Sequence, residues 1–352
     1  MRHAFVLARR ALGQVAPNPA VGCVIVSREG RVVGCGWTVP GGRPHAETIA
    51  LTRAGVAARG ATAYVTLEPC AHHGETPPCA EALLQAGVAR VVAAIEDPDP
   101  RVRGKGFNIL RAGGVELTTG LLEREAADLN AGFFLRIQED RPLVTLKLAR
   151  SRDGMTVPPA AASRWITGEE ARRFGHLLRA QHDAILVGIG TVLADDPELT
   201  CRLPGLHDRS PVRVVIDTQL RTPAVSKVVQ SARVVPTLIF TATEGGDALR
   251  QHGAEVLRVV HDESGRPSLR AVLGVLAGRG CTRLLVEGGA TVISAFLHEG
   301  YADRLEVFTA PVTLGAGADG QIAALSNLGG RFTRVGQRVL GPDLLETYAA
   351  SA

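Results

Sequence analysis

The chain has 352 residues, 45% of them hydrophobic, and a formal net charge of +4 at pH 7. This composition excludes a disordered chain, and no apolar run is long enough to cross a bilayer. Dispersed basic residues and an aromatic content of 4% argue against a nucleic-acid partner, whereas the mild positive charge suits a small anionic substrate. The length predicts two domains, and the lack of a clear signal peptide predicts a cytoplasmic protein with no membrane anchor.

The first 140 residues alternate between helix and strand patterns, which predicts a layered α/β domain. Helices are expected at 4–13, 44–54 and 79–86. Strands are expected at 21–27, 31–37, 63–67 and 89–95. The charged helical stretch 120–141 is interpreted as a connector. We therefore place one domain at 1–140 and a second at 141–352.

The second half opens a new α/β pattern. Strands are expected at 143–149, 184–188, 212–217, 237–241, 284–287 and 304–309, and helices at 167–181 and 290–299. Glycine-containing turns at 188–191 and 287–291 each follow a strand, and such turns let the backbone approach a phosphate. Together they fit a ligand crevice at the strand ends of an open sheet. The chain has no GxGxxG sequence at these turns, which argues against a Rossmann domain.

A histidine and two cysteines carry the strongest chemical signal. His45, Cys70 and Cys79 offer the imidazole and thiolate ligands that Zn²⁺ prefers, and three of them leave a fourth position for water. Glu47 is placed to move protons beside the metal. This set is typical of a zinc deaminase, in which activated water displaces an amine from a ring carbon.

Taken singly, His45 could merely cap a helix and each cysteine could be a small buried hydrophobe, as we interpret the other four cysteines. The occurrence of His45, Glu47, Cys70 and Cys79 in this order favours a metal site over a helix cap with two buried cysteines. Its spacing is unusual, because eight residues separate Cys70 from Cys79 where the common deaminase signature has two.

The sequence Thr-Leu-Glu-Pro-Cys-Ala-His-His-Gly-Glu-Thr-Pro-Pro-Cys at 66–79, with Pro-Asn-Pro-Ala-Val-Gly at 17–22, closely resembles the bifunctional deaminase/reductase family of riboflavin biosynthesis. The resemblance covers essentially the whole chain. It implies an α/β fold with an N-terminal cytidine-deaminase-like α/β/α domain and a C-terminal dihydrofolate-reductase-like α/β domain. The first would deaminate a diaminopyrimidinone that bears a ribosylamino 5-phosphate. The second would reduce the ribosyl group to ribityl with NADPH.

The resemblance also implies roles for individual residues. Deaminase substrate contacts would be Asn18, His72, His73 and Lys105, which could otherwise be ordinary turn or solvated loop residues. NADPH contacts would be Arg150, Trp165, Thr191, Asp195, Thr218, Gly289, Ala290 and Thr291. Reductase substrate contacts would be Lys147, Ser163, Arg179, Leu199, Arg202 and Glu287. Without the family, Trp165 would be read as a core aromatic and Arg179 as part of a surface ion pair.

Departures from the family pattern keep alternatives open. Arg150 and Arg152 stand where the family usually has alanine and leucine, and Pro158-Pro159 precedes Ala161, where it usually has glycine. A zinc deaminase with a weakened or inactive reductase domain is therefore one alternative. A nucleic-acid base deaminase and a structural zinc module without catalysis are two others. The expected partners are a phosphorylated pyrimidine substrate and further copies of the chain, as a dimer or tetramer.

Overall fold

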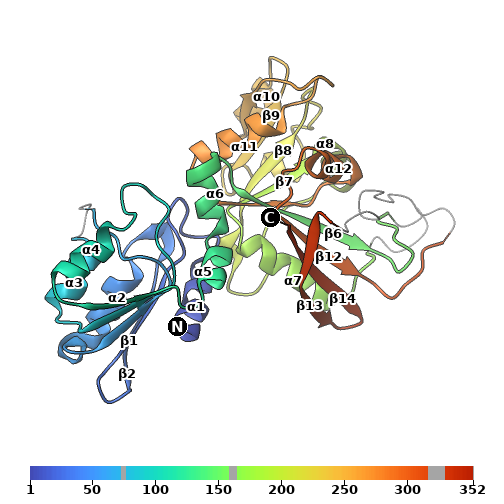
Figure 1. The fold of residues 1–352 in the computed structure, drawn as a ribbon. Coiled ribbons are helices and arrows are strands. Elements are labelled where there is room, and N and C mark those ends of the chain that lie inside the picture. The colour runs from blue at the N-terminus through green and yellow to red at the C-terminus, as the bar shows by residue number, and fades with distance from the viewer. Residues whose placement is uncertain (73–76, 158–164, 316–329, 352) are drawn as a thin grey trace. The chain divides into compact units, whose positions relative to one another are not determined.

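The structure is a computed structural model that describes residues 1–72, 77–157, 165–315 and 330–351 (Figure 1). The chain divides into two compact units, Met1–Arg141 and Pro142–Ala352. Each unit is built around its own sheet, and the two are described separately. In the described part of the chain, no helix is both long and apolar enough to span a membrane.

The first sheet has five strands in the order β2-β1-β3-β4-β5. They are β1 (Gly22–Val26), β2 (Val32–Trp37), β3 (Thr62–Val65), β4 (Arg90–Ala93) and β5 (Glu116–Thr119). β1 is antiparallel to β2 and β3, whereas β3, β4 and β5 run parallel. The helices are α1 (Arg2–Ala8), α2 (Ala46–Ala54), α3 (Cys79–Gln85), α4 (Lys105–Ala112), α5 (Glu123–Leu129) and α6 (Ala131–Glu139).

Helices cover both faces of this sheet, because successive residues of a strand point to opposite sides. On β1, Cys23 and Ile25 join the core beneath α2, α3 and α4. Val24, between them, packs with residues of α1 on the other face. The result is a three-layered α/β/α unit.

Small residues let α2 approach β2 closely. A Cβ atom at Gly34 would stand 2.2 Å from the carbonyl oxygen of Ala50, and one at Gly36 would stand 2.1 Å from that of Ala46. Neither strand position can hold a side chain at this separation. Because α2 begins at Ala46, the close packing also fixes His45, the residue just before the helix.

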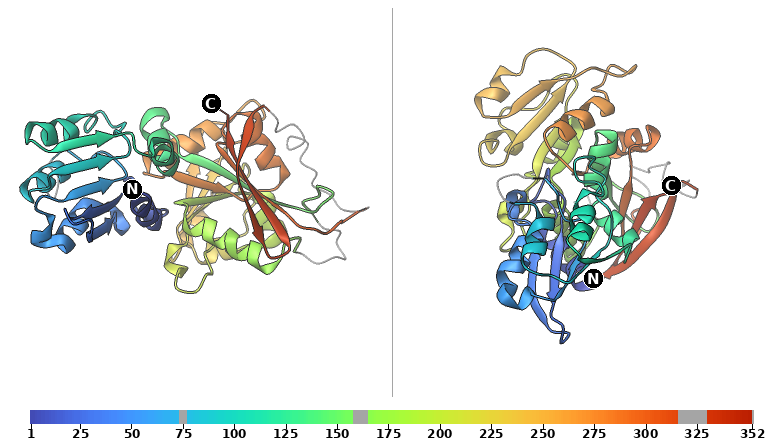
Figure 2. Two further views of the ribbon diagram at one scale, coloured as in Figure 1. Left: turned by 60° about the horizontal axis from the view of Figure 1, so that its bottom comes forward. Right: turned by 60° about the vertical axis from the view of Figure 1, so that its left-hand side comes forward.

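The second sheet has nine strands in the order β10-β9-β8-β7-β11-β6-β12-β14-β13. They are β6 (Leu143–Arg150), β7 (Ala184–Gly188), β8 (Val212–Ile216), β9 (Thr237–Thr241), β10 (Glu255–Arg258), β11 (Arg283–Val286), β12 (Arg304–Thr309), β13 (Phe332–Leu340) and β14 (Asp343–Ala350). The strands from β10 to β12 are parallel, and β14 is antiparallel to both β12 and β13. The red β13–β14 hairpin is plain in Figure 2.

Helices again lie on both faces of the second sheet. They are α7 (Glu169–Ala180), α8 (Ile189–Asp195), α9 (Lys227–Gln230), α10 (Asp247–Gln251), α11 (Leu269–Gly278) and α12 (Ala290–His298). Leu284 and Val286 of β11 pack in a core with α11 and α12, whereas Leu285 faces the core that includes α7. Strand β11 is buried along its whole length, as expected for a central strand of a parallel sheet.

The predicted α/β class is confirmed, and the six strands predicted in the second half appear within one residue of their expected bounds. Four strands were not predicted. β5 and β10 have four residues each and are partly exposed, and β13 is mostly exposed at the edge of its sheet. These strands, with β14, lack a continuous apolar run. The predicted connector helix is two helices, α5 and α6, separated at Asn130.

Candidate active sites

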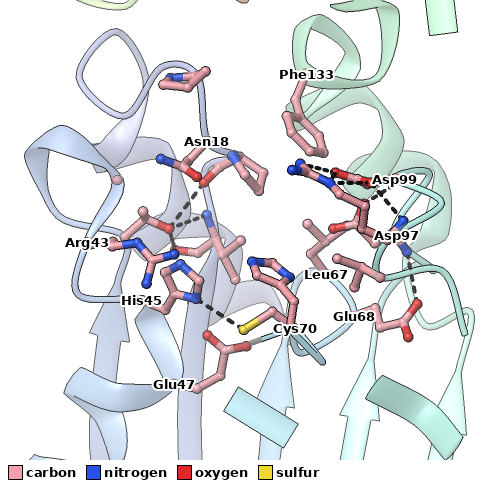
Figure 3. Close-up of a pocket in the computed structure, with 18 of the residues that line it drawn as sticks. Asn18, Arg43, His45, Glu47, Leu67, Glu68, Cys70, Asp97, Asp99 and Phe133 are labelled. Atoms are coloured by element: carbon pink, nitrogen blue, oxygen red, sulfur yellow. Dashed lines mark hydrogen bonds and ion pairs between the residues drawn. The ribbon is translucent and has the colours of Figure 1, made fainter. Parts of the chain in front are cut away.

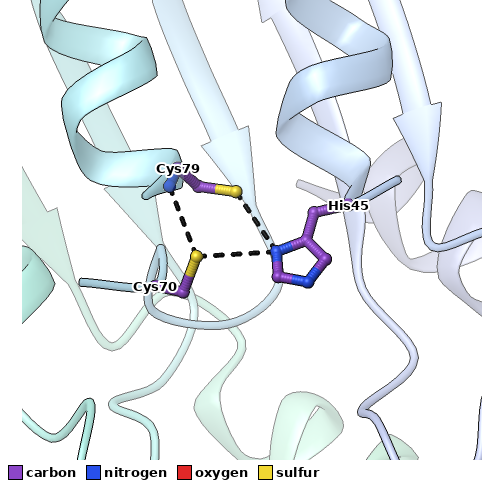
Figure 4. A group of neighbouring side chains, drawn as sticks. All are labelled: His45, Cys70 and Cys79. Atoms are coloured by element: carbon purple, nitrogen blue, oxygen red, sulfur yellow. Dashed lines mark hydrogen bonds between the residues drawn. The ribbon is translucent and has the colours of Figure 1, made fainter. Parts of the chain in front are cut away.

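The three candidate zinc ligands meet between two helix starts and a loop. His45 immediately precedes α2, Cys79 is the first residue of α3, and Cys70 lies beyond β3. The Nδ1 atom of His45 is 3.3 Å from the Sγ of Cys79 and 3.5 Å from the Sγ of Cys70 (Figure 4). All three ligand atoms lie within 4.8 Å of one another.

These separations fit Zn²⁺, because tetrahedral bonds of about 2.0–2.3 Å place neighbouring ligand atoms roughly 3.5–3.8 Å apart. The chemistry of the donors fits as well. A hydrogen bond from Cys79, aided by a second from His45, lowers the pKa of the Cys70 thiol to about 4. The backbone N–H of Cys79 also donates to the Cys70 sulfur at 3.3 Å. The hydrogen bond between the two cysteine side chains raises the pKa of the Cys79 thiol, so Cys70 is the one of the two sulfurs that carries the negative charge.

Glu47 lies in the first turn of α2 and is only 3% exposed. Burial raises the pKa of its carboxyl to about 7, although the charge of His45 opposes this rise. A carboxyl group with a pKa near neutrality can both take up and release a proton. Figure 3 shows Glu47, His45 and Cys70 close together on one side of a pocket.

That pocket has a volume of about 300 Å³. Its lining includes His45, Glu47 and Cys70, and also Asn18 and His72, two of the expected substrate contacts. Asn18 and Phe133 lie on the side of the pocket away from Glu47 (Figure 3). Lys105 is the first residue of α4 and is not part of the lining, and His73 lies outside the described residues.

Sequence reasoning missed several residues of this lining, among them Arg43, Phe133 and Arg136. Arg43 stands two residues before His45, which is a weak signal. Phe133 and Arg136 belong to α6, in the stretch that we interpreted as a connector, and no local motif marks them. The pocket therefore takes one wall from a helix far along the chain.

Glu68 holds the loop on which Cys70 stands. Its carboxylate accepts hydrogen bonds from four backbone N–H groups at 3.0–3.3 Å, those of Asp97, Gly104, Gly106 and Phe107. Gly106 must lack a side chain, because a Cβ there would stand 1.9 Å from the carbonyl oxygen of Pro69. The Glu-Pro-Cys sequence is thereby fixed against the start of α4.

In the second unit, the structure brings together three of the expected reductase substrate contacts. Arg179 on α7 pairs with Glu287 just beyond β11, and Lys147 on β6 lies near both. Burial lowers the pKa of Lys147, while the Glu287 charge acts in the opposite direction. His176, one turn before Arg179 on the same helix, was missed. Burial, then the charges of Arg179 and Arg202, lowers the pKa of His176 to about 4.

The loop that carries Leu199 and Arg202 is fastened to α7. The Thr200 carbonyl oxygen accepts a hydrogen bond from Arg179 at 3.0 Å and lies 3.1 Å from the His176 Nδ1 atom. Leu199 is buried and has a φ of 56°, an uncommon backbone conformation for a leucine. The Arg202 side chain pairs with Glu198 at 3.2 Å.

The expected NADPH contacts occupy the ends of neighbouring strands. Thr191 and Asp195 lie on α8 after β7, and Gly289, Ala290 and Thr291 form the start of α12 after β11, which pairs with β7. Thr218 follows β8. Trp165 is 55% exposed, so it is not a core aromatic. Ser163, expected to contact substrate, lies outside the described residues.

Two details qualify this region. Arg150 donates to the Thr309 hydroxyl at 3.0 Å and lies 3.9 Å from Glu346, so its side chain reaches along the sheet toward β12 and β14. At Gly288 an added Cβ would stand 2.8 Å from Val292, whereas at Gly289 it would meet no described atom within 4 Å. Gly288 therefore allows close packing of α12, and Gly289 borders open space.

Each of the two units matches the model of a known protein family. A family model described as the RibD C-terminal domain matches residues 142–345. A second, the cytidine and deoxycytidylate deaminase zinc-binding region, matches residues 1–95. The riboflavin biosynthesis protein RibD of Aquifex aeolicus is 42% identical over 90% of this chain and 87% of its own length. The Escherichia coli protein of the same name is 42% identical over 91% of this chain and 89% of its own.

Two solved structures match the fold of this chain over its whole length. RibD from Acinetobacter baumannii superposes with a TM-score of 0.87 at 38% identity, covering 100% of this chain and 98% of that one. A Thermotoga maritima protein, described as a diaminohydroxyphosphoribosylaminopyrimidine deaminase/5-amino-6-(5-phosphoribosylamino)uracil reductase, gives 0.86 at 35% identity, covering 100% and 97%. These matches confirm the predicted fold class and the resemblance carried by residues 66–79. The chain belongs to the RibD family, the bifunctional zinc-dependent deaminases and reductases of riboflavin biosynthesis.

Proposed function

We propose that Met1–Arg141 deaminates 2,5-diamino-6-(5-phosphoribosylamino)pyrimidin-4-one and that Pro142–Ala352 then reduces its ribosyl group to ribityl with NADPH. This division corresponds to a deaminase domain at 1–140 and a reductase domain at 141–352. The observation that carries the proposal is the convergence of three metal-ligating atoms within 4.8 Å beside a buried carboxyl group in a pocket. The Thermotoga maritima relative, a diaminohydroxyphosphoribosylaminopyrimidine deaminase/5-amino-6-(5-phosphoribosylamino)uracil reductase, supports this substrate.

For deamination, His45, Cys70 and Cys79 would hold Zn²⁺, which when bound lowers the pKa of water toward neutrality. Glu47 takes one proton from water and gives it to the ring nitrogen. It then takes a second proton from the hydroxyl group added at the ring carbon and gives it to the amine, which leaves as ammonia, and a carboxyl pKa of about 7 favours both transfers. Burial of Glu47 keeps that proton from exchanging freely with solvent.

Other lining residues orient the pyrimidine. The Asn18 amide can both donate to and accept from the polar edge of a ring, and His72 can contact the ring's polar substituents. Phe133 offers a flat apolar surface at the pocket wall. We retain His73 and Lys105 as further proposed substrate contacts.

For reduction, the residues mainly position the two reactants. NADPH, when bound, supplies the hydride. We assign its contacts to Arg150, Trp165, Thr191, Asp195, Thr218, Gly289, Ala290 and Thr291. We assign substrate contacts to Lys147, Ser163, Arg179, Leu199, Arg202 and Glu287. The open space at Gly289, where a helix begins, suits the approach of a cofactor phosphate.

We also propose a cytoplasmic homo-oligomer, either a dimer or a tetramer. All six cysteines are unpaired, which fits a reducing compartment. Light scattering of the purified protein measures the oligomeric state, and a monomer at micromolar concentration would overturn that part of the proposal.

Two activity measurements test the main proposal. The purified protein should contain one zinc per chain and release ammonia from the diaminopyrimidine substrate. With the deaminated intermediate, it should consume NADPH, followed as loss of absorbance. Ammonia release without NADPH consumption at saturating protein would show that the reductase is inactive. Absence of both would overturn the assigned function.

A further inference from the structure

The wall of the deaminase pocket that α6 supplies carries Arg136, which has no acidic partner among the described residues. Arg136 lines the pocket one turn after Phe133. Its Nη2 donates to the carbonyl oxygen of Pro17 at 3.3 Å, and its Nε is buried without a hydrogen-bond partner. Within the described residues, no carboxylate forms an ion pair with it. A half-buried guanidinium with unmet donors is a site that an anion would complete.

Arg101 also lines the pocket but is already neutralised. Its Nε lies 2.9 Å from the Oδ2 of Asp99 and 3.0 Å from the Oδ1, and its side chain is 76% exposed. An exposed, paired guanidinium gains less from a second anion than a half-buried, unpaired one. Arg136 is therefore the stronger candidate for binding an anionic ligand.

Arg136 is also held in place before any ligand binds. Asn130, the residue between α5 and α6, is 3% exposed and forms two hydrogen bonds with the backbone of Ala20. Its Oδ1 accepts from the Ala20 N–H at 2.9 Å, and its Nδ2 donates to the Ala20 carbonyl oxygen at 3.1 Å. Ala20 follows the segment that carries Asn18, so one anchor fixes both the proposed ring contact and the helix that bears Arg136.

We propose that Arg136 recognises the phosphate monoester of the deaminase substrate. The planar guanidinium fork binds phosphate oxygens in pairs, and α6 places it on the same pocket as the ring-binding Asn18. Arg136 thereby makes the enzyme select a pyrimidine that carries a sugar phosphate over the free base or nucleoside. This inference rests on the proposed deaminase function of the same pocket.

The test compares two substrates, the phosphorylated diaminopyrimidine and the same compound without its phosphate, by ammonia release. For Arg136→Gln we expect KM for the phosphorylated substrate to rise by about 10- to 100-fold, as for the loss of charge-assisted hydrogen bonds. Activity on the dephosphorylated compound should not change. Arg124→Gln, an exposed arginine on the neighbouring α5, is the matched control and should behave like the parent.

An equal loss on both substrates, or no loss on either, would overturn the role of Arg136. A parent enzyme that releases ammonia from neither substrate would instead overturn the proposed function, so the two failures are distinguishable. If Arg136→Gln does not fold, the test uses Arg136→Lys in its place. Inhibition of ammonia release by ribose 5-phosphate is then compared between this variant and the parent. Competitive inhibition that weakens about tenfold in Arg136→Lys supports the proposal, and unchanged inhibition contradicts it.

Discussion

Arg179 and Glu287 form a bidentate ion pair that joins α7 to the end of β11. The Nε and Nη2 atoms of Arg179 lie 2.8 and 2.9 Å from the two carboxylate oxygens, and the side chains are 15% and 12% exposed. Burial alone would raise the pKa of Glu287, but the charge and hydrogen bonds of Arg179 outweigh it and lower that pKa to about 2. The carboxylate is therefore ionised throughout the neutral range.

Glu287→Gln should leave Arg179 buried without its counter-charge. We expect a loss of about 3 kcal/mol in the free energy of unfolding of the second unit, measured by urea titration. NADPH consumption should fall while ammonia release is unchanged. Glu255→Gln is the matched control, because Glu255 pairs with Arg279 at the surface and should cost at most about 1 kcal/mol. Equal losses in the two variants would contradict this assignment.

His182 should make the second unit sensitive to acid. It is 2% exposed, and its ring nitrogens contact the Leu178 carbonyl oxygen at 2.6 Å and the Thr145 hydroxyl at 3.0 Å. Burial, helped by the charge of Arg283, lowers its pKa to about 3. This folded pKa lies below the ordinary value of about 6.5, so the unfolded chain binds a proton at His182 more readily than the folded chain does. The free energy of unfolding therefore has its full value above pH 6.5 and decreases as the pH falls from 6.5 toward 3.

By pH 5 the expected loss from His182 is about 2 kcal/mol relative to pH 8. Urea unfolding of the parent and of His182→Gln at both pH values measures it. The variant should be less stable at pH 8 but should lose about 2 kcal/mol less between the two pH values. A variant that loses stability as steeply as the parent would show that other groups cause the acid sensitivity.

Glu47→Gln should abolish ammonia release without removing the metal. The amide cannot take up a proton, so we expect a decrease of at least about 100-fold in kcat. Zinc content, measured by elemental analysis, and NADPH consumption should match the parent. Glu123→Gln, on the exposed surface of α5, controls for a general effect of losing a carboxylate. Persistent ammonia release would remove Glu47 from the proton transfer.

Removal of the metal should separate the two activities. Cys79→Ser weakens the ligand set, and we expect zinc content and ammonia release to fall together. NADPH consumption with the deaminated intermediate should persist, because all three ligands belong to the first unit. Parallel loss of NADPH consumption would indicate that the metal also supports the second unit.

Glu68→Gln tests the clamp on the Cys70 loop. The carboxylate accepts hydrogen bonds from four backbone N–H groups. In the glutamine, the NH2 group would face two of these N–H groups, and donors would then face donors. We expect a loss of about 2–3 kcal/mol in the stability of the first unit, with weaker zinc retention. Urea unfolding and zinc content during dialysis against a chelator provide the measurements. Stability equal to the parent would mean that the loop is held by other contacts.

Sequence patterns could predict the central strands because their signals are strong and local. β7 and β9 have the expected bounds, and each is largely apolar along its length. β12 also has the expected bounds, with Leu305, Val307 and Phe308 as its apolar residues. The candidate zinc ligands could be selected for a similar reason, since His45 and Cys79 stand at helix starts and Cys70 just beyond a strand. Their catalytic roles stay predictions until the variants are measured.

The rest depends on contacts between distant parts of the chain. Nothing near residue 130 indicates that Asn130 binds the backbone of a residue 110 positions earlier. The polar, exposed β13 resembles a loop in sequence, and only pairing with β14 makes it a strand. Phe133 and Arg136 likewise reach the pocket through α6, which Asn130 joins to the backbone of Ala20.

The anchoring of α6 bears on how the two activities could be separated in evolution or by design. The zinc-binding region recognised by its family model ends at residue 95, yet the pocket also uses Phe133 and Arg136. A protein truncated after residue 95 would keep the three proposed zinc ligands but would lack Phe133 and Arg136 on one side of the pocket. A cut after Arg141 would keep the wall. A deaminase domain with a complete pocket wall therefore has to include α5 and α6.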